Sequence, residues 1–99
     1  MTDSDMYGRV SWLVAADDAI LRLLGTPRQI ELSPADIAHN TGYTSGHVQD
    51  RLRLLVDAGL ARKIEVEGSY TRYTTTELGE GYVADQLTAQ ELEELDPTD

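Results

Sequence analysis

Two helix-start signals lie close together in the middle of this chain, and the link between them is only a few residues long. Ser33-Pro34-Ala35-Asp36 supplies a capping hydroxyl and a proline suited to the first helical position. It also supplies an acid that can accept the reciprocal hydrogen bond of a capping box. Gly42 ends this helix, and a second helix over about 44–58 stops at Gly59, in the position where a left-handed cap favours glycine. Two helices joined so tightly form a helix-turn-helix in outline.

The second of these helices has two faces of opposite character. Its apolar residues fall on one side of the helix and predict a buried face: Val48, Leu52, Leu55 and Val56. Its polar residues gather on another side: Ser45, Gly46, Gln49, Asp50 and Arg53, flanked by His47 and Arg51. Thr44 or Ser45 is the expected cap. Such a helix is fixed in place by one face and presents the other to a partner.

One helix and a short strand are expected before this pair. Helical spacing of apolar residues predicts a helix over about 15–24, and Asp17 and Asp18 lie near its positive N-terminus. Alternation of polar and apolar residues predicts a short strand over 29–32.

A hairpin and a last helix are expected after the pair. Two alternating runs, 61–66 and 70–75, surround Glu67-Gly68-Ser69 and predict a β-hairpin. Thr76 caps the last helix, and a capping box at Thr88-Ala89-Gln90-Glu91 indicates that the helix breaks there and restarts.

This order of elements is that of a winged helix-turn-helix. We expect an α+β fold, mainly helical, with a three-helix core, a two-stranded wing and a C-terminal helix. The expected parts are a flexible N-terminus over 1–10, the DNA-binding domain over 11–87, and an acidic C-terminal helix and tail over 88–99 that could extend a dimerisation helix. In such a fold helix 44–58 reads the major groove, and hairpin 61–75 reaches the flanking backbone.

The net charge of −10 is unevenly distributed. Residues 44–76 hold four acids and five bases, whereas residues 77–99 hold eight acids and no base. Lys63 is the only lysine, and this composition resembles that of proteins from salt-loving microbes with molar cytoplasmic KCl. An acidic protein from an ordinary cytoplasm is the alternative. In molar salt the Debye length is only about 3 Å, so an acidic chain can approach DNA.

Several classes of function are not expected. Cysteine is absent, which excludes a disulfide framework and a cysteine-ligated zinc site. No apolar run approaches a membrane span, and no signal-peptide core is seen, so we expect a cytoplasmic protein with no membrane partner. His39 and His47, with Asp36 and Asp50 nearby, lack the spacing of metal ligands. No residues are spaced for catalysis. We therefore expect no metal, no cofactor and no enzyme.

An ordered series of motifs runs from Trp12 to about Leu87. In chain order the motifs are Trp12, Asp17-Asp18-x-Ile20-Leu21-x-x-Leu24, Ser33-Pro34-x-x-Ile37-Ala38, Gly42-Tyr43-x-Ser45-x-x-Val48, Leu52-x-x-Leu55-x-x-x-Gly59-Leu60, Tyr70-x-x-Tyr73 and Thr76-x-x-Gly79-x-x-Tyr82. With this series the chain resembles the winged-helix regulators of haloarchaea, particularly those similar to haloarchaeal phage repressors. The resemblance implies sequence-specific binding to double-stranded DNA in transcription control, usually as a homodimer. We expect a repressor that blocks access to a promoter.

The resemblance also implies roles for individual residues, carried over by position. Ser45, Gly46, Gln49, Asp50 and Arg53 would face the DNA groove, and Arg62, Lys63 and Arg72 would serve the wing. Asp50 departs from the more positive charge of most recognition helices, because its carboxylate should repel phosphate.

The residues themselves leave alternatives open for these contacts. Arg53 could bond a guanine edge, or it could pair with Asp50 or Asp57 at helical spacing. Arg51 is less well placed and is expected to reach a phosphate or a nearby acid. Gln49 could read adenine, and Asp50 could accept a bond from a cytosine amino group.

The last helix carries an apolar stripe that could pair across a two-fold axis: Leu78, Tyr82, Leu87 and Leu92. A dimer of this kind would place two recognition helices about one DNA turn apart. The rival hypothesis is a winged-helix module that binds another protein and no DNA.

Overall fold

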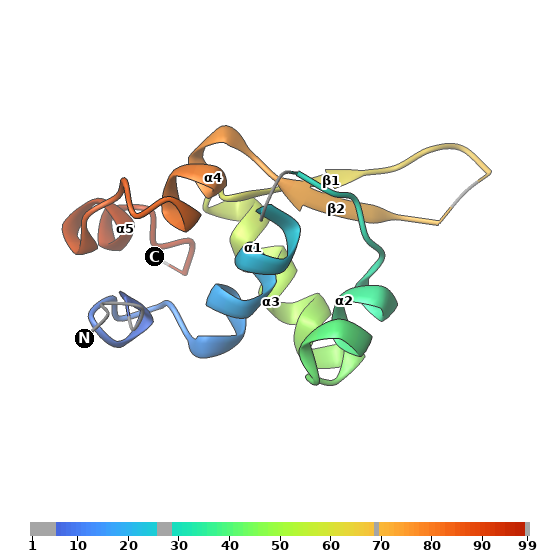
Figure 1. Cartoon of the computed structure of the whole chain (residues 1–99), viewed down its shortest axis with the longest axis horizontal. Coiled ribbons are helices and arrows are strands. Elements are labelled where there is room, and N and C mark those ends of the chain that lie inside the picture. The colour runs from blue at the N-terminus through green and yellow to red at the C-terminus, as the bar shows by residue number, and fades with distance from the viewer. Residues whose placement is uncertain (1–5, 26–28, 69, 99) are drawn as a thin grey trace.

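Three helices pack against one another at the centre of the fold, and a two-stranded hairpin leaves them as an extended arm (Figure 1). A computed structural model describes residues 6–25, 29–68 and 70–98. The elements in chain order are η1 (Met6–Gly8), α1 (Ala15–Gly25), α2 (Pro34–Thr41), α3 (Ser45–Asp57), β1 (Ala61–Ile64), β2 (Arg72–Thr75), α4 (Glu77–Val83) and α5 (Ala89–Glu94). The predicted winged helix-turn-helix is confirmed.

Four helices begin at hydroxyl side chains that accept a hydrogen bond from a backbone N–H of the first turn. The caps are Ser33 for α2, Thr44 for α3, Thr76 for α4 and Thr88 for α5. At Thr88 the bond is reciprocal, since Glu91 Oε1 accepts from the Thr88 N–H at 2.8 Å. This capping box separates α5 from α4, as predicted, because each restart needs its own partner for unsatisfied N–H groups.

A left-handed glycine sets the angle between α2 and α3. Gly42 ends α2 with a φ of 84°, a conformation in which a Cβ would be strained. Its N–H donates to the Ala38 carbonyl at 2.9 Å, so the turn satisfies a carbonyl of the last helical turn. Only residues 42–44 separate the two helices, which holds α3 in a fixed pose against α2.

The wing is a two-stranded antiparallel sheet. Its register pairs Arg62 with Thr74, Lys63 with Tyr73, and Ile64 with Arg72. Both strands are shorter than the predicted runs 61–66 and 70–75.

The strand predicted over 29–32 is wrong except at its last residue. Leu32 alone forms a bridge, with Tyr73 of β2. The chain then enters the cap of α2, where Ser33 takes up its capping role and Pro34 has no N–H for a ladder.

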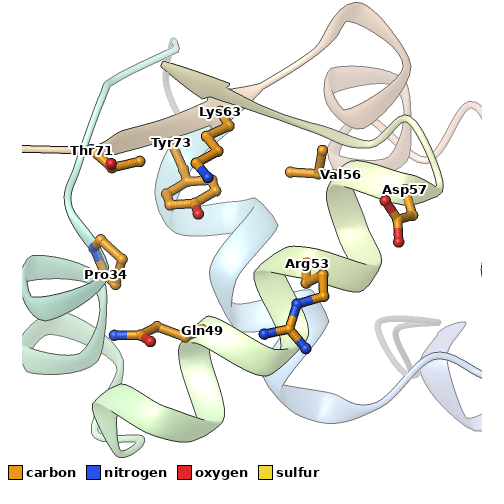
Figure 2. Close-up of a pocket in the computed structure, with 8 residues that line it drawn as sticks. All are labelled: Pro34, Gln49, Arg53, Val56, Asp57, Lys63, Thr71 and Tyr73. Atoms are coloured by element: carbon orange, nitrogen blue, oxygen red, sulfur yellow. The ribbon is translucent and has the colours of Figure 1, made fainter. Parts of the chain in front are cut away.

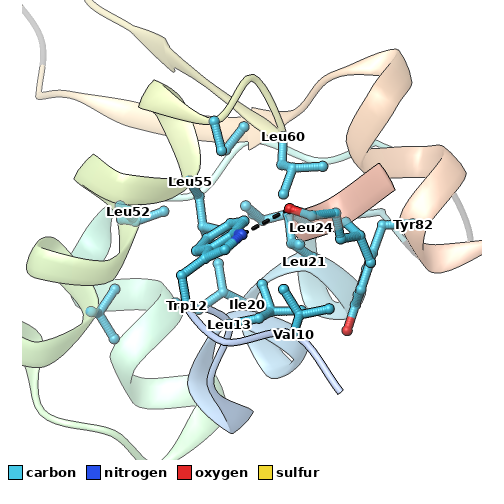
Figure 3. Close-up of a cluster of buried hydrophobic side chains, with 14 of the residues drawn as sticks. Val10, Trp12, Leu13, Ile20, Leu21, Leu24, Leu52, Leu55, Leu60 and Tyr82 are labelled. Carbon is cyan, nitrogen blue, oxygen red and sulfur yellow. Dashed lines mark hydrogen bonds between the residues drawn. The ribbon is translucent and has the colours of Figure 1, made fainter. Parts of the chain in front are cut away.

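The core closes both ends of the chain onto α1 (Figure 3). Trp12, the only tryptophan, is 7% exposed, and its indole N–H donates to the Leu92 carbonyl at 2.8 Å. Glu93 accepts hydrogen bonds from the backbone N–H and the hydroxyl of Ser11. The segment preceding α1 and the last helix therefore form one packed unit.

Residues 6–10, which belong to the N-terminus expected to be flexible over 1–10, lie against the core. Val10 is buried in the core, and Met6 and Tyr7 of η1 pack against it. Residues 1–5 lie outside the described residues.

Helix α4 lies very close to the end of α3. A Cβ added at Gly79 would overlap the Leu60 carbonyl oxygen and reach its carbonyl carbon at 3.1 Å. Only glycine allows this approach. In the described part of the chain, no helix is long and apolar enough to cross a membrane.

Candidate nucleic-acid interface

Helix α3 has the two faces that its sequence predicts, except that Val56, expected on the buried face, is only partly buried. Val48, Leu52 and Leu55 are fully buried against the core. The polar side of the helix is exposed along its length: Ser45, Gly46, His47, Gln49, Asp50 and Arg53. The burial on one side holds the exposed side rigidly outward, which is what recognition of a large rigid surface requires.

The start of α3 is organised by its cap and by the turn before it. Thr44 Oγ1 accepts from the His47 N–H at 3.2 Å, and the His47 ring lies 5.6 Å from that of Tyr43, centroid to centroid. Gln49 Nε2 donates to Ser45 Oγ at 3.4 Å. Among the described residues, the hydrogen bonds of these exposed polar groups stay within the first turns of α3 and its cap.

The two arginines of α3 have opposite environments. Arg51 turns inward: its Nε and Nη2 donate to the two carboxylate oxygens of Asp17 at 2.9 and 2.8 Å. Its Nη2 also donates to the Trp12 carbonyl at 2.9 Å. Asp17 is fully buried and the Arg51 side chain is 15% exposed. Of the two partners expected for Arg51, the structure provides the acid, and the prediction of Arg51 as a DNA contact does not fit this arrangement.

This ion pair fixes α3 to the start of α1. Asp17 Oδ2 also accepts from the Val14 N–H at 2.9 Å, so the same carboxylate caps α1 and holds Arg51. The hydrogen bond that Arg51 donates to Asp17, opposed by burial and aided by the charge of Asp17, raises the pKa of Arg51. Arg51 is therefore a permanent cation that anchors the polar helix to the core.

Arg53 lies two residues further on and is exposed. Among the residues that the structure describes, no carboxylate forms an ion pair with it. The predicted alternative of a pair with Asp50 or Asp57 is therefore not what the structure shows, and the guanidinium is available to a partner.

A groove of about 490 Å³ separates α3 from the wing (Figure 2). Its lining comes from α2, α3 and both wing strands or their flanks: Pro34, Gln49, Arg53, Val56, Asp57, Lys63, Thr71 and Tyr73. A second hollow of about 500 Å³ shares Pro34, Gln49 and Thr71 with it and continues toward Ser45 and Tyr70. Together they form one continuous groove along the exposed side of α3.

The three basic residues predicted for the wing do not share a face. Lys63 and Tyr73 are register partners that both line the groove. Arg62 and Arg72 have the opposite parity on their strands, so they lie on the other face of the hairpin. Arg72 lies 3.7 Å from Glu31 in an ion pair. Of the three predicted wing contacts, only Lys63 lies in the groove.

Lys63 is held only loosely. It pairs with Glu65 at 3.4 Å, and the two side chains are 47% and 68% exposed. An exposed pair of this kind contributes about 0–1 kcal/mol, so Lys63 can exchange Glu65 for another anion at little cost.

The apolar stripe predicted for dimerisation is largely used inside the protomer. Tyr82 and Leu92 are buried, at 3% and 0% exposure. The Tyr82 hydroxyl donates to Asp18 Oδ1 at 2.6 Å. Burial, and then this hydrogen bond, raises the pKa of Tyr82. Leu87 is half-buried, and Leu78 is 36% exposed. Tyr82 and Leu92 therefore cannot form an interface between two copies, because their own core covers them.

The described residues contain no group of three or more His, Cys, Asp or Glu side chains that could hold a metal ion. His39 lies exposed on α2 and His47 on α3.

The exposed α3, the tight turn before it and the wing beside it form the frame of a DNA-binding regulator. The sequence matches the model of the winged helix-turn-helix phage repressor family over residues 6–95. The chain belongs to this family. It is a family of DNA-binding regulators and not of enzymes, which confirms that expectation from the sequence.

A relative and a solved structure agree with the family. The chain is 48% identical over 88 residues to the repressor protein of Halobacterium phage phiH, covering 89% of this chain and 98% of that protein. A double mutant of Lactococcus lactis ZitR superposes with a TM-score of 0.64 at 21% identity. That match covers 84% of this chain and 55% of that one, so this chain spans about half its length, and the likeness concerns the fold alone.

Some residues of the groove could not be recognised from the sequence of this repressor-family chain. Pro34, Thr71 and Tyr73 look like a helix start and strand residues, and only folding brings them beside α3. Asp17 gave one usable signal, because its place in the first turn of α1 marks it as a capping acid. Its distant partner Arg51 left no such signal.

Proposed function

We propose that the chain is a sequence-specific DNA-binding transcriptional repressor that lays α3 in the major groove and the wing against the flanking backbone. The observation that carries the proposal is the α3 surface: exposed polar side chains on one side, and full burial of Val48, Leu52 and Leu55 on the other. Occupying a promoter with such a surface blocks access to it.

The first turns of α3 are suited to base reading. In helix-turn-helix proteins the N-terminal residues of the second helix contact base edges. Gln49 has the amide that bonds adenine bidentately, and Asp50 has an acceptor for a cytosine amino group. Ser45 and Gly46 leave room for a close approach, since a Cβ at Gly46 would meet nothing within 4 Å.

We also infer that the protein works in a cytoplasm of high KCl. The net charge of −10 and the single lysine support this, as does the relative from a phage of Halobacterium. Molar salt screens the repulsion between DNA and the acidic C-terminal helices. It also removes most of the affinity that phosphate contacts supply. Groove contacts must then provide more of the binding. No cofactor is needed for this activity.

Two copies acting at one operator remain part of the proposal. A homodimer would place two α3 helices on successive turns of one DNA face. Of the predicted stripe, Leu78 and Leu87 keep accessible surface for such an interface. Sedimentation equilibrium in molar KCl, with and without operator duplex, measures the stoichiometry. A monomer that binds an asymmetric site as a single copy would contradict the dimer.

The test of DNA recognition is selection followed by binding. Duplexes enriched from a random library by the protein in molar KCl are labelled, and fluorescence anisotropy compares the selected sequence with its scrambled version. We expect tight binding to the selected duplex alone. A folded protein that enriches no sequence and binds no duplex at any salt concentration would overturn the proposal and favour the protein-interaction module.

A matched pair of glutamine variants separates reading from folding. Gln49→Ala should weaken binding to the selected duplex about 5- to 150-fold, as expected for the loss of a bidentate base contact, and leave scrambled DNA unaffected. Gln90→Ala, an exposed change on α5, should alter neither. Equal losses in the two variants would indicate an effect on the fold and not on reading.

A further inference from the structure

We propose that Arg53 and Lys63 grip the backbone of one DNA strand from the two sides of the groove between α3 and the wing, and that Arg53 does not read a base. This inference rests on the proposed function. It assigns a phosphate-binding site and removes a residue from the base-reading set.

The first step is the position of the groove relative to DNA. If α3 lies in the major groove and the wing lies against the flanking backbone, that backbone must pass between α3 and the wing. The space between α3 and the wing is the groove of about 490 Å³ in Figure 2. The part of this groove between Arg53 and Lys63 therefore faces a sugar-phosphate backbone.

The second step is the set of charges in that groove. Arg53 enters from α3 and Lys63 from β1, so the two cations come from opposite walls (Figure 2). Neither cation is held in a buried ion pair within the described residues. Arg53 forms no ion pair there, and Lys63 has only the exposed pair with Glu65. Arg51, which is held in the ion pair with Asp17, is not part of the groove lining.

The third step is the position of Arg53 along α3. It is the ninth residue of a helix that begins at Ser45, about two turns beyond the first residues that would contact bases. Gln49 lies between, and lines the same groove one turn earlier. Base reading by the first turns and backbone contact by Arg53 are therefore compatible in one docked pose.

The groove also contains neutral donors and nearby acids that limit the contact. Thr71 can donate a hydroxyl to a phosphate, as neutral side chains commonly do. Asp57 lines the groove beyond Arg53, and Asp36 lines the adjoining hollow. These carboxylates repel phosphate near them, which confines neutralisation to the few phosphates nearest Arg53 and Lys63.

The test compares salt dependence with sequence preference. Anisotropy titrations over about 0.2–2 M KCl use the selected duplex and its scrambled version, with circular dichroism to confirm the fold. Arg53→Gln and Lys63→Gln should each weaken binding to both duplexes by the same factor, about tenfold at fixed salt. Each should also reduce the log–log salt slope by about 0.9, as expected for one lost phosphate contact.

Arg62 provides the matched control. It is exposed and adjacent to Lys63 on the same strand, but it lies on the opposite face of the hairpin. Arg62→Gln removes the same charge from the same wing and should leave the salt slope unchanged. A slope lowered as much by Arg62→Gln as by Lys63→Gln would overturn the assignment, because overall charge would then explain both.

A methylphosphonate scan locates the contact. One phosphate at a time is made neutral in the selected duplex, and the loss for the wild-type protein is compared with the loss for each variant. We expect to find phosphates on one strand whose neutralisation weakens binding by the wild-type protein. Neutralising the same phosphates should cause no further loss of binding for Arg53→Gln or Lys63→Gln. Positions on different strands for the two variants would contradict the proposal.

The outcomes distinguish this inference from the proposed function. If Arg53→Gln weakens binding to the selected duplex much more than to the scrambled one, Arg53 reads a base and the inference fails while the repressor function stands. If the wild-type protein binds no duplex, both fail.

Discussion

Replacing Arg51 by methionine should destabilise the protein and not act through DNA. The side chain holds the fully buried carboxylate of Asp17 with two hydrogen bonds, at 2.9 and 2.8 Å. Without the guanidinium, the Val14 N–H is the one remaining donor to that carboxylate among the residues that the structure describes. A buried charge that loses its partner costs about 3–5 kcal/mol.

This loss is a large part of what a domain of this size has. A single small domain is stable by about 5–15 kcal/mol, and 1 kcal/mol shifts the melting temperature by about 4–8 °C at this length. Arg51→Met should therefore lower the melting temperature by about 12 °C or more. Asp17→Asn keeps an oxygen for the Val14 N–H and should cost less, about 1–3 kcal/mol.

The double variant gives the coupling between the two residues. With both charges removed, the site contains no unpaired ion, so Asp17→Asn combined with Arg51→Met should cost less than Arg51→Met alone. Urea unfolding at constant KCl, followed by the fluorescence of the single buried Trp12, measures all three variants.

Arg53→Met is the control on the same helix. Arg53 is exposed, so its loss should change the free energy of unfolding by no more than about 0.5 kcal/mol. The reasoning is refuted if Arg51→Met and Arg53→Met cost the same stability, or if the two changes at Arg51 and Asp17 are additive. It is also refuted if Arg51→Met keeps the fold intact and abolishes DNA binding.

Two glycines of α4 and one tyrosine give further tests. Gly79→Ala should cost about 1–3 kcal/mol, because the new Cβ would overlap the Leu60 carbonyl oxygen, whereas Gly81→Ala, with only ordinary contacts at 3.7 and 3.9 Å, should gain about 0.5–1 kcal/mol. Urea melts of the pair decide, and effects of the same sign would contradict the close approach. Burial, and then the hydrogen bond to Asp18, raises the pKa of Tyr82 above its ordinary value near 10. Its contribution to stability is therefore complete below about pH 10 and declines by about 1.4 kcal/mol per pH unit above it, where the unfolded chain loses the proton first. In Tyr82→Phe this decline of stability with rising pH should vanish. An unchanged dependence of stability on pH in alkaline melts would contradict the role of Tyr82.

The features that the sequence predicted well depend on neighbours in the chain. Ser33, Thr76 and Thr88 were recognisable as caps, and Thr44 was one of two candidates with Ser45, because a hydroxyl bonds an N–H only two or three residues away. Gly42 followed from the same local chemistry. These signals are sufficient to place the helices, and the order of the helices then gives the fold.

The features that the sequence could not give depend on residues far apart. Arg51 and Arg53 are two positions apart on one helix, and only the folded chain brings Asp17 to the first and leaves the second open. The same holds for the wing, where the register decides that Lys63 faces α3 and Arg62 does not. The apolar pattern of the last helices predicted that Tyr82 and Leu92 are buried. It could not show whether they are buried in the core of the same chain or against a second copy.

The hydrogen bond between Trp12 and Leu92 joins residues 80 positions apart, and it has a consequence for how the protein is made. Synthesis proceeds at about 5–20 residues per second, so Trp12 leaves the peptidyl-transferase centre roughly 4–16 s before its partner exists. During that interval α5 is not yet present to accept the hydrogen bond of the indole. The contact between the segment before α1 and α5 can therefore form only after α5 has been synthesised.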